Sequence, residues 1–282
     1  MKRYLLWGVV ALVIGMTWGL LHWKQVSSGL ELVTCHPNSS NINTPIHFFV
    51  TDDVLDVMSQ SQVRESIQRR IDMSNTILTN SCIPLHREVK TITYVDFSDE
   101  YLFDFGSVHF ALERAVGTQT IGKIRQTINE FYAVLLGPDN TIFDSQWLGT
   151  SEMTPDGRFI ALAYNAPDYT LEHELGHLAG ADHDELTIEE QALYGFEQIV
   201  PLWDQKQLKP YARAALCGDA GTVMSYHQNI LPIYSQPNIR YQGQNCGDAH
   251  RANNSRVLTE FSQRLQREFT LGHWVPAQIA PL

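Results

Sequence analysis

The sequence predicts an α/β fold, in the α+β sense of a mixed, twisted sheet with long helices, followed by a loop-rich C-terminal subdomain that a helix closes. Two observations support this prediction. Short apolar runs typical of buried strands alternate with helical patterns through residues 45–183. Four prolines then interrupt residues 200–245, before a last helical pattern over residues 251–269. Because no low-complexity linker separates these parts, we expect one domain with two subdomains.

The first half of the chain contains the clearest elements. Residues 46–51 are apolar and residues 85–95 alternate in polarity with many β-branched side chains, so both are predicted strands. Between them, residues 57–80 carry apolar side chains at helical spacing with charges opposite, which predicts a long amphipathic helix. A short helix is expected over residues 108–116, and residues 128–136 form a second apolar run that ends at a turn.

Shorter elements are expected in the middle of the chain. Residues 141–148 and 159–164 are predicted strands. A helix is expected from Asp168, whose side chain is a suitable cap, to about Ala179. Gly180 follows at once and can end this helix, because glycine accepts the positive φ that other residues resist.

Composition and charge exclude several classes of protein. The chain has 282 residues, of which 44% are hydrophobic, so it is long enough for a sizeable core and too apolar for a disordered protein. Acidic residues outnumber basic ones 31 to 20, which gives a net charge of -11. A nucleic-acid binder usually has a basic surplus, so we expect no nucleic-acid partner.

The N-terminus carries a hydrophobic segment. Residues 4–23 contain no charged side chain, and twenty helical residues rise about 30 Å, the thickness of a bilayer core. Lys2 and Arg3 precede the run, which places the remainder outside the cytoplasm. We therefore expect a transmembrane signal anchor over residues 1–23, then a tether over residues 24–44. The alternative is a signal peptide cleaved near Val26-Ser27-Ser28, which would release a secreted protein.

The four cysteines all lie in the exported part. An even number in a periplasmic or extracellular setting indicates two disulfides. Cys35 precedes the first predicted strand and Cys82 precedes the second, so neighbouring parallel strands would bring these two together. Cys217 and Cys246 then form the second predicted pair.

One segment has the spacing of a metal site. On a helix, residues four apart share a face, so His173 and His177 present two imidazoles toward one point. Glu174 lies beside the first ligand, where a carboxylate can take a proton from water. His183 completes the set if the chain turns at Gly180. Three histidines leave the fourth position of a tetrahedral Zn²⁺ open, which is typical of catalytic zinc.

This spacing of His, Glu, His, Gly and His resembles the extended motif of the metzincin zinc metallopeptidases. Its ending, His183-Asp184, is similar to the adamalysin (reprolysin) branch and to related bacterial enzymes. The resemblance implies a methionine-bearing turn beneath the zinc, for which Met224 is the candidate. It extends over residues 45–270, although only the motif and the segment around Met224 are specific.

The resemblance implies that residues 45–282 form a zinc metalloendopeptidase domain acting on a protein or peptide substrate. His173, His177 and His183 would hold Zn²⁺, and Glu174 would serve as general base and then as acid. Residues 141–150 are the candidate edge strand that pairs with the substrate. Two other classes stay open: a non-catalytic zinc-binding or substrate-binding module of the same fold, and a metal-dependent amidase acting on a non-protein polymer.

Tyr226 has two interpretations. A tyrosine two residues after the methionine reaches the zinc in some metzincins, where its hydroxyl can stabilise an oxyanion. The adamalysin-like ending favours the other interpretation, in which Tyr226 packs behind the turn and satisfies its hydroxyl elsewhere. We therefore leave Tyr226 out of the predicted site.

Overall fold

The computed structural model describes most of the chain between residues 29 and 271. The residues described are 29–35, 41–97, 100–143, 148–152, 157–185, 187 and 209–271. Among them, no helix is both long and apolar enough to cross a membrane, so the transmembrane and signal-anchor prediction is corrected. The segment for which that prediction was made, residues 1–23, lies outside the described residues.

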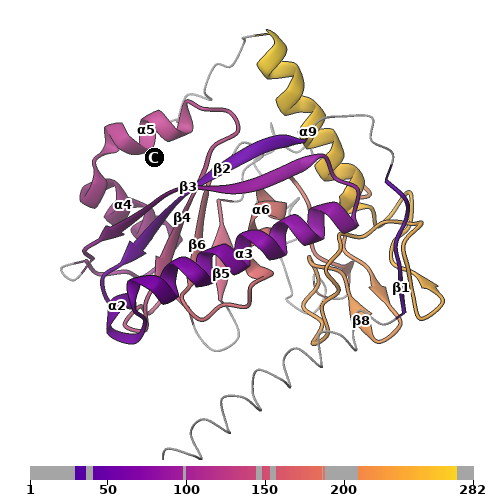
Figure 1. The fold of residues 1–282 in the computed structure, drawn as a ribbon, viewed down its shortest axis with the longest axis horizontal. Helices are drawn as coiled ribbons and strands as arrows, with labels where there is room; N and C mark the ends of the chain where they lie inside the picture. Colours follow the sequence, from indigo (N-terminus) through magenta and orange to yellow (C-terminus); the bar gives the residue numbers. More distant parts are fainter. Residues whose placement is uncertain are drawn as a thin grey trace, which may run out of the picture.

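A five-stranded mixed sheet forms the centre of the molecule (Figure 1). Its strand order is β3-β2-β4-β6-β5; all neighbours are parallel except β5, which runs antiparallel to β6 at one edge. The strands are β2 (Ile42–Thr51), β3 (Leu85–Val95), β4 (Phe131–Leu136), β5 (Gly149–Ser151) and β6 (Phe159–Ala163). The fold is thus α+β with a mixed sheet, as the sequence predicts.

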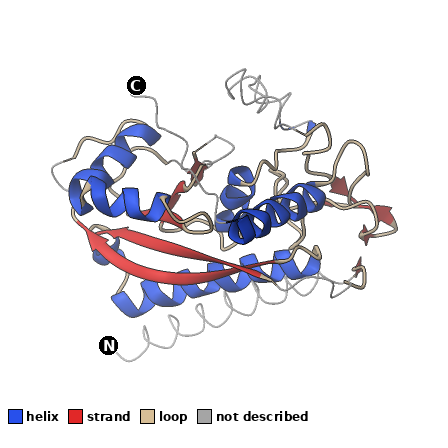
Figure 2. Cartoon of the chain, turned by 90° about the horizontal axis from the view of Figure 1, so that it is seen from above, coloured by secondary structure: helices blue, strands red, loops and turns tan. Residues whose placement is uncertain are grey.

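Helices cover both faces of this sheet. Figure 2 shows the long strands separating the longest helix from the two shorter helices on the other side. One apolar core joins the sheet to α3 (Gln60–Asn80), α6 (Thr170–Leu178) and α9 (Asn254–Leu271). A second core joins the opposite face to α4 (Phe105–Val116) and α5 (Thr118–Arg125), while α2 (Val54–Val57) is a short turn of helix after β2.

Helix α3 is fixed both by its sequence pattern and by a cap. Its buried side chains recur at helical spacing, so the helix presents one apolar face to the sheet. Ser59 Oγ accepts a hydrogen bond from the Gln62 backbone N–H, and Gln62 Oε1 accepts one from the Ser59 N–H at 2.7 Å. This reciprocal capping box satisfies two backbone donors and explains why the helix starts at Gln60.

A second, loop-rich part follows α6 and is tied together by short strands and a disulfide. It contains β7 (Leu216–Cys217), β8 (Ala220–Gly221), β9 (Arg240–Tyr241) and β10 (Gln244–Asn245). β1 (Leu30–Glu31), which lies within the predicted tether, pairs with β9. The bridges Cys35–Cys82 and Cys217–Cys246 are both present, which confirms the predicted pairing and indicates an oxidising extracellular or periplasmic environment.

Two local predictions are wrong. Helix α6 starts at Thr170 after Tyr169, which makes no side-chain cap; the predicted cap, Asp168, instead accepts a 3.3 Å hydrogen bond from Arg69 of α3. The strand predicted at residues 141–148 is shifted to Gly149–Ser151, because Asn140 binds the backbone N–H groups of the next residues in a turn. Residues 144–147 lie outside the described residues.

Candidate metal centre

Helix α6 carries the predicted motif and is buried along all nine of its residues. A helix this short is marginal on its own, so tertiary contacts must hold it. Gly176 shows how close these contacts are. A Cβ at this position would lie 2.6 Å from Met224 Sδ and 2.9 Å from Tyr234 Oη, so only glycine lets these residues approach the helix.

The turn after α6 brings the third histidine back. Gly180 has φ +94°, the left-handed conformation that the sequence predicts at this position. The Gly180 N–H donates to the His177 carbonyl and the Ala181 N–H to the Gly176 carbonyl, both at 2.9 Å, which closes the helix end. The chain therefore reverses direction within a few residues, and His183 returns to the helix face that carries His173 and His177.

Three imidazoles meet at one point. His173 Nε2 lies 3.2 Å from His177 Nε2 and 3.2 Å from His183 Nε2. Ligand nitrogens about 2.0–2.1 Å from a tetrahedral Zn²⁺ lie about 3.3 Å apart, so this spacing suits zinc. Among the residues that the structure describes, this is the one group of three or more His, Cys, Asp or Glu side chains close enough to hold a metal ion.

The other ring nitrogens show that the cluster presents lone pairs. His173 Nδ1 lies 2.9 Å from the Val223 carbonyl, and His177 Nδ1 lies 3.0 Å from the Ala181 carbonyl. A carbonyl oxygen only accepts, so both Nδ1 atoms carry the proton and both Nε2 atoms are left with lone pairs. Lone pairs facing one another repel, and a cation between them removes that repulsion. The donor set therefore fits a metal ion that prefers nitrogen, such as zinc.

Burial keeps these histidines neutral. Removal from water lowers the pKa of His173 to about 3 and that of His177 to about 4, and it lowers the pKa of His183 well below its ordinary value. The neighbouring imidazoles lower the pKa of His173 and His183 further. All three rings are therefore uncharged at neutral pH, the state in which imidazole binds a metal.

Glu174 lies next to the cluster and against the edge strand β5. Burial raises the pKa of its carboxyl group to about 8, and the nearby Ser151 side chain partly opposes that rise. A Cβ at Gly149 would lie 2.7 Å from Glu174 Oε1, so the backbone of β5 passes directly beside this carboxylate. The sequence did not single out Gly149 or Ser151. The glycine was the available clue, because a glycine in a strand often marks a close approach.

Tyr226 lies on the metal side of its turn. Its ring stacks on His173 with centroids 5.5 Å apart and packs at a tilt on His183 at 4.6 Å, while half of the residue remains exposed. Packing behind the turn is therefore a wrong expectation. Met224, by contrast, is fully buried with its sulfur toward Gly176, as expected of a residue beneath the cluster.

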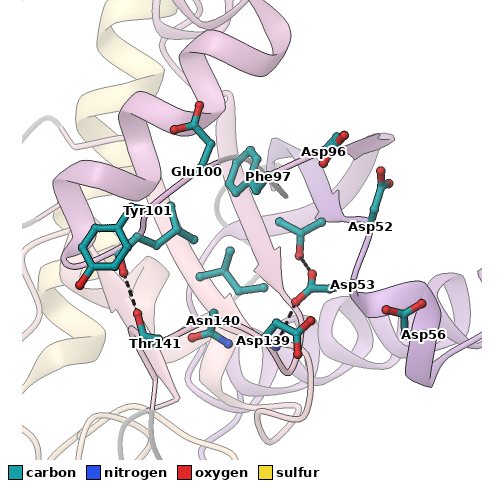
Figure 3. Close-up of a pocket in the computed structure, with 13 residues that line it drawn as sticks. Asp52, Asp53, Asp56, Asp96, Phe97, Glu100, Tyr101, Asp139, Asn140 and Thr141 are labelled. Carbon is teal, nitrogen blue, oxygen red and sulfur yellow. Dashed lines mark hydrogen bonds between the residues drawn. The ribbon is translucent and has the colours of Figure 1, made fainter.

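A second polar site lies elsewhere in the fold. A cavity of about 510 Å³ opens at the carboxyl ends of β2, β3 and β4. Carboxylates line it (Figure 3): Asp52, Asp53, Asp56, Asp96, Glu100 and Asp139. Asp53 accepts hydrogen bonds from the Thr51 hydroxyl and the Asp139 backbone. The carboxylates are spread around the cavity rather than gathered at one point.

Comparisons with known proteins give information about the fold and none about the activity. No protein-family model matches the chain, and no curated protein matches it in sequence. A solved chain from a chaperone-substrate complex matches with a TM-score of 0.61 at 11% identity, over 82% of this chain and 36% of that one. Metalloproteinase-II from Bacteroides fragilis matches weakly, with a TM-score of 0.33 at 18% identity, over 62% and 54% of the two chains. This chain therefore spans little more than a third and about half of their respective lengths.

Proposed function

We propose that the protein is a zinc-dependent metalloendopeptidase. The observation that carries the proposal is the convergence of three imidazole Nε2 atoms, two of them held in the metal-binding tautomer by backbone carbonyls. His173, His177 and His183 would be the zinc ligands. Zinc bound there supplies a Lewis acid that polarises a carbonyl oxygen and lowers the pKa of water.

Glu174 would act as the general base and then as the general acid. It follows His173 directly on α6, and it is 4% exposed, so its carboxylate is held in one place beside the cluster. Its raised pKa makes it a stronger base than an exposed glutamate and lets it keep a proton long enough to pass it to a leaving amine. A metal cation nearby would lower this pKa again, because it favours the ionised form.

Edge strand β5 would orient an extended peptide. β5 pairs with β6 on one side and is the last strand of the described sheet, so its other side can bind a substrate strand. Because the β5 backbone passes beside Glu174, a peptide paired to β5 would bring its backbone near the same carboxylate. This arrangement favours a peptide substrate over a compact small molecule.

The finer assignment to the metzincins, in their adamalysin-like branch, is part of the proposal. The motif from His173 to Asp184 and the buried Met224 beneath it support the assignment. Val223 contacts His173 and Met224 contacts Gly176, so the turn that contains Met224 packs directly on α6. Residues 45–282 would be the catalytic domain, exported to an oxidising compartment.

A mixed peptide library tests the proposal. The zinc-loaded protein should cleave peptides, a chelator should abolish cleavage, and added zinc should restore it. A cell-wall amide polymer is assayed in parallel. Zinc binding with cleavage of that polymer alone would replace the peptidase by an amidase. Zinc binding with no hydrolysis of either substrate would leave a non-catalytic binding module.

A further inference from the structure

A buried ion pair joins α6, which carries His173 and His177, to β3, the edge strand farthest from β5. Arg87 Nε and Nη2 on β3 donate to the two carboxylate oxygens of Glu172 on α6, both at 3.0 Å. The two side chains are 1% and 0% exposed. Glu172 immediately precedes His173, so this pair acts on the backbone that carries the first predicted metal ligand.

The arginine end of the pair is itself held rigidly. Arg87 Nη1 donates to Thr44 Oγ1 at 3.0 Å, and Thr44 Oγ1 donates to the His86 carbonyl at 2.9 Å. The side-chain amide of Asn75 on α3 binds the Arg87 backbone twice: its Oδ1 accepts from the Arg87 N–H at 2.8 Å, and its Nδ2 donates to the Arg87 carbonyl at 2.9 Å. The guanidinium therefore has one position relative to β2, β3 and α3, and Glu172 must conform to it.

Tyr234 links the same glutamate to the chain beneath the metal cluster. Its hydroxyl lies 2.8 Å from the Glu172 carbonyl and 3.0 Å from Glu172 Oε1, and the residue is fully buried. The same hydroxyl would clash with a side chain at Gly176, one turn further along α6. Glu172 and Gly176, four residues apart, thus share a helix face that lies about a quarter of a turn around α6 from the face of the two histidines, and both contact the Tyr234 side chain.

We propose that Arg87 and Glu172 are positioning residues. They set the orientation and position of α6 relative to the sheet, and through α6 the geometry of the three-histidine cluster. The inference rests on the proposed metal site. A buried ion pair is often no more stabilising than an apolar pair of similar volume, because desolvation offsets the attraction. A bidentate guanidinium–carboxylate pair does fix the relative orientation of two elements, which apolar side chains do not.

The test separates positioning from stability. In the double variant Arg87→Met/Glu172→Leu, apolar side chains of similar volume fill the space of the buried charges. Thr44 still donates to the His86 carbonyl and Tyr234 to the Glu172 carbonyl, so the variant should fold. Zinc affinity is measured by competition with a chelating dye, which needs no substrate. We expect a roughly 10- to 100-fold loss of zinc affinity, as found when groups that orient metal ligands are removed.

A second variant tests whether the two parallel donors of the Arg87 guanidinium are needed. Arg87→Lys keeps the charge but offers a single ammonium group in place of two parallel donors. It should fold, and its zinc affinity should fall by about tenfold. If the double variant does not fold, this measurement decides the question alone.

The control is the ion pair between Arg114 and Glu100, which has the same two-point contact on the other side of the sheet. Arg114→Met/Glu100→Leu should leave zinc affinity unchanged. Wild-type zinc affinity in a folded Arg87→Met/Glu172→Leu variant would overturn the inference and reduce the pair to a space-filling role. Because the readout is zinc binding alone, failure of the wild type to cleave peptides would reject the proposed function without affecting this result.

Discussion

The three-histidine cluster and the acidic cavity concentrate polar groups in different ways. Two histidines of the cluster are buried and the third is partly buried. The two buried ones have their Nδ1 atoms bound to backbone carbonyls, and the Nε2 atoms converge to 3.2 Å. The cavity at the ends of β2, β3 and β4 holds six acidic side chains, and among the described residues they form no group with metal-ligand spacing. A metal site requires oriented ligands, and a high density of charge does not supply them.

The largest effect that tests this comparison is expected on zinc binding. His177→Ala removes one of three ligands and exposes the two remaining lone pairs to solvent. Bound zinc should fall from one ion per chain to almost none, and any peptidase activity with it, measured by elemental analysis after dialysis. Asp56→Asn in the acidic cavity is the matched control and should retain one zinc. Equal zinc loss in both variants would mean that the ion binds through general negative charge.

A smaller effect is expected on stability in the absence of metal. The Glu174 carboxyl group has a pKa near 8 in the fold and near 4.5 when unfolded, so the folded protein favours the protonated form. Its contribution is fully present below pH 4.5 and is lost as the pH rises through about 8. Glu174→Gln mimics the neutral form. Metal-free Glu174→Gln should therefore be more stable than wild type by about 3 kcal/mol at pH 7 and by less than about 1 kcal/mol at pH 5.

Urea unfolding in the presence of a chelator, at both pH values, measures this difference. Asp56→Asn serves again as the control, because its carboxylate is exposed. A stability difference between Glu174→Gln and wild type that stays the same from pH 5 to pH 7 would show that the Glu174 carboxyl is not held in a desolvated position.

The smallest effect concerns the aromatic contact of Tyr226. Its ring packs on His173 and His183, and such contacts contribute about 0.5–1.5 kcal/mol. Tyr226→Ala should lower zinc affinity by about three- to tenfold, whereas Tyr226→Phe keeps the ring and should retain affinity and kcat. A hundredfold loss of kcat in Tyr226→Phe, with zinc retained, would instead assign the hydroxyl to oxyanion stabilisation.

Periodicity and spacing were sufficient for the parts of the fold that local chemistry determines. The helix at Gln60–Asn80 and the strand at Leu85–Val95 follow from their own patterns, and the turn at Gly180 follows from glycine's backbone freedom. The disulfide partners followed because parallel strands lie side by side. The convergence of His173 and His177 followed from the helix repeat.

What could not be predicted depends on contacts between distant segments. The partner of Glu172 lies 85 residues away on another strand, and a lone glutamate beside a histidine motif gives no sign of it. Asp168 has the chemistry of a cap, yet an arginine of α3 competes for its carboxylate. Tyr226 could pack on either side of its turn, and only the folded chain after Met224 places it against the histidines.

The most direct test of the central claim is the turnover of zinc-loaded Glu174→Gln. The substitution preserves volume and leaves all three histidines in place, so zinc content should stay at one ion per chain. Loss of the general base should lower kcat on a peptide substrate by about a thousandfold. That combination of full zinc and lost turnover is the result we predict. Near-normal turnover by zinc-loaded Glu174→Gln would contradict the assignment of Glu174 and with it the proposed hydrolytic mechanism.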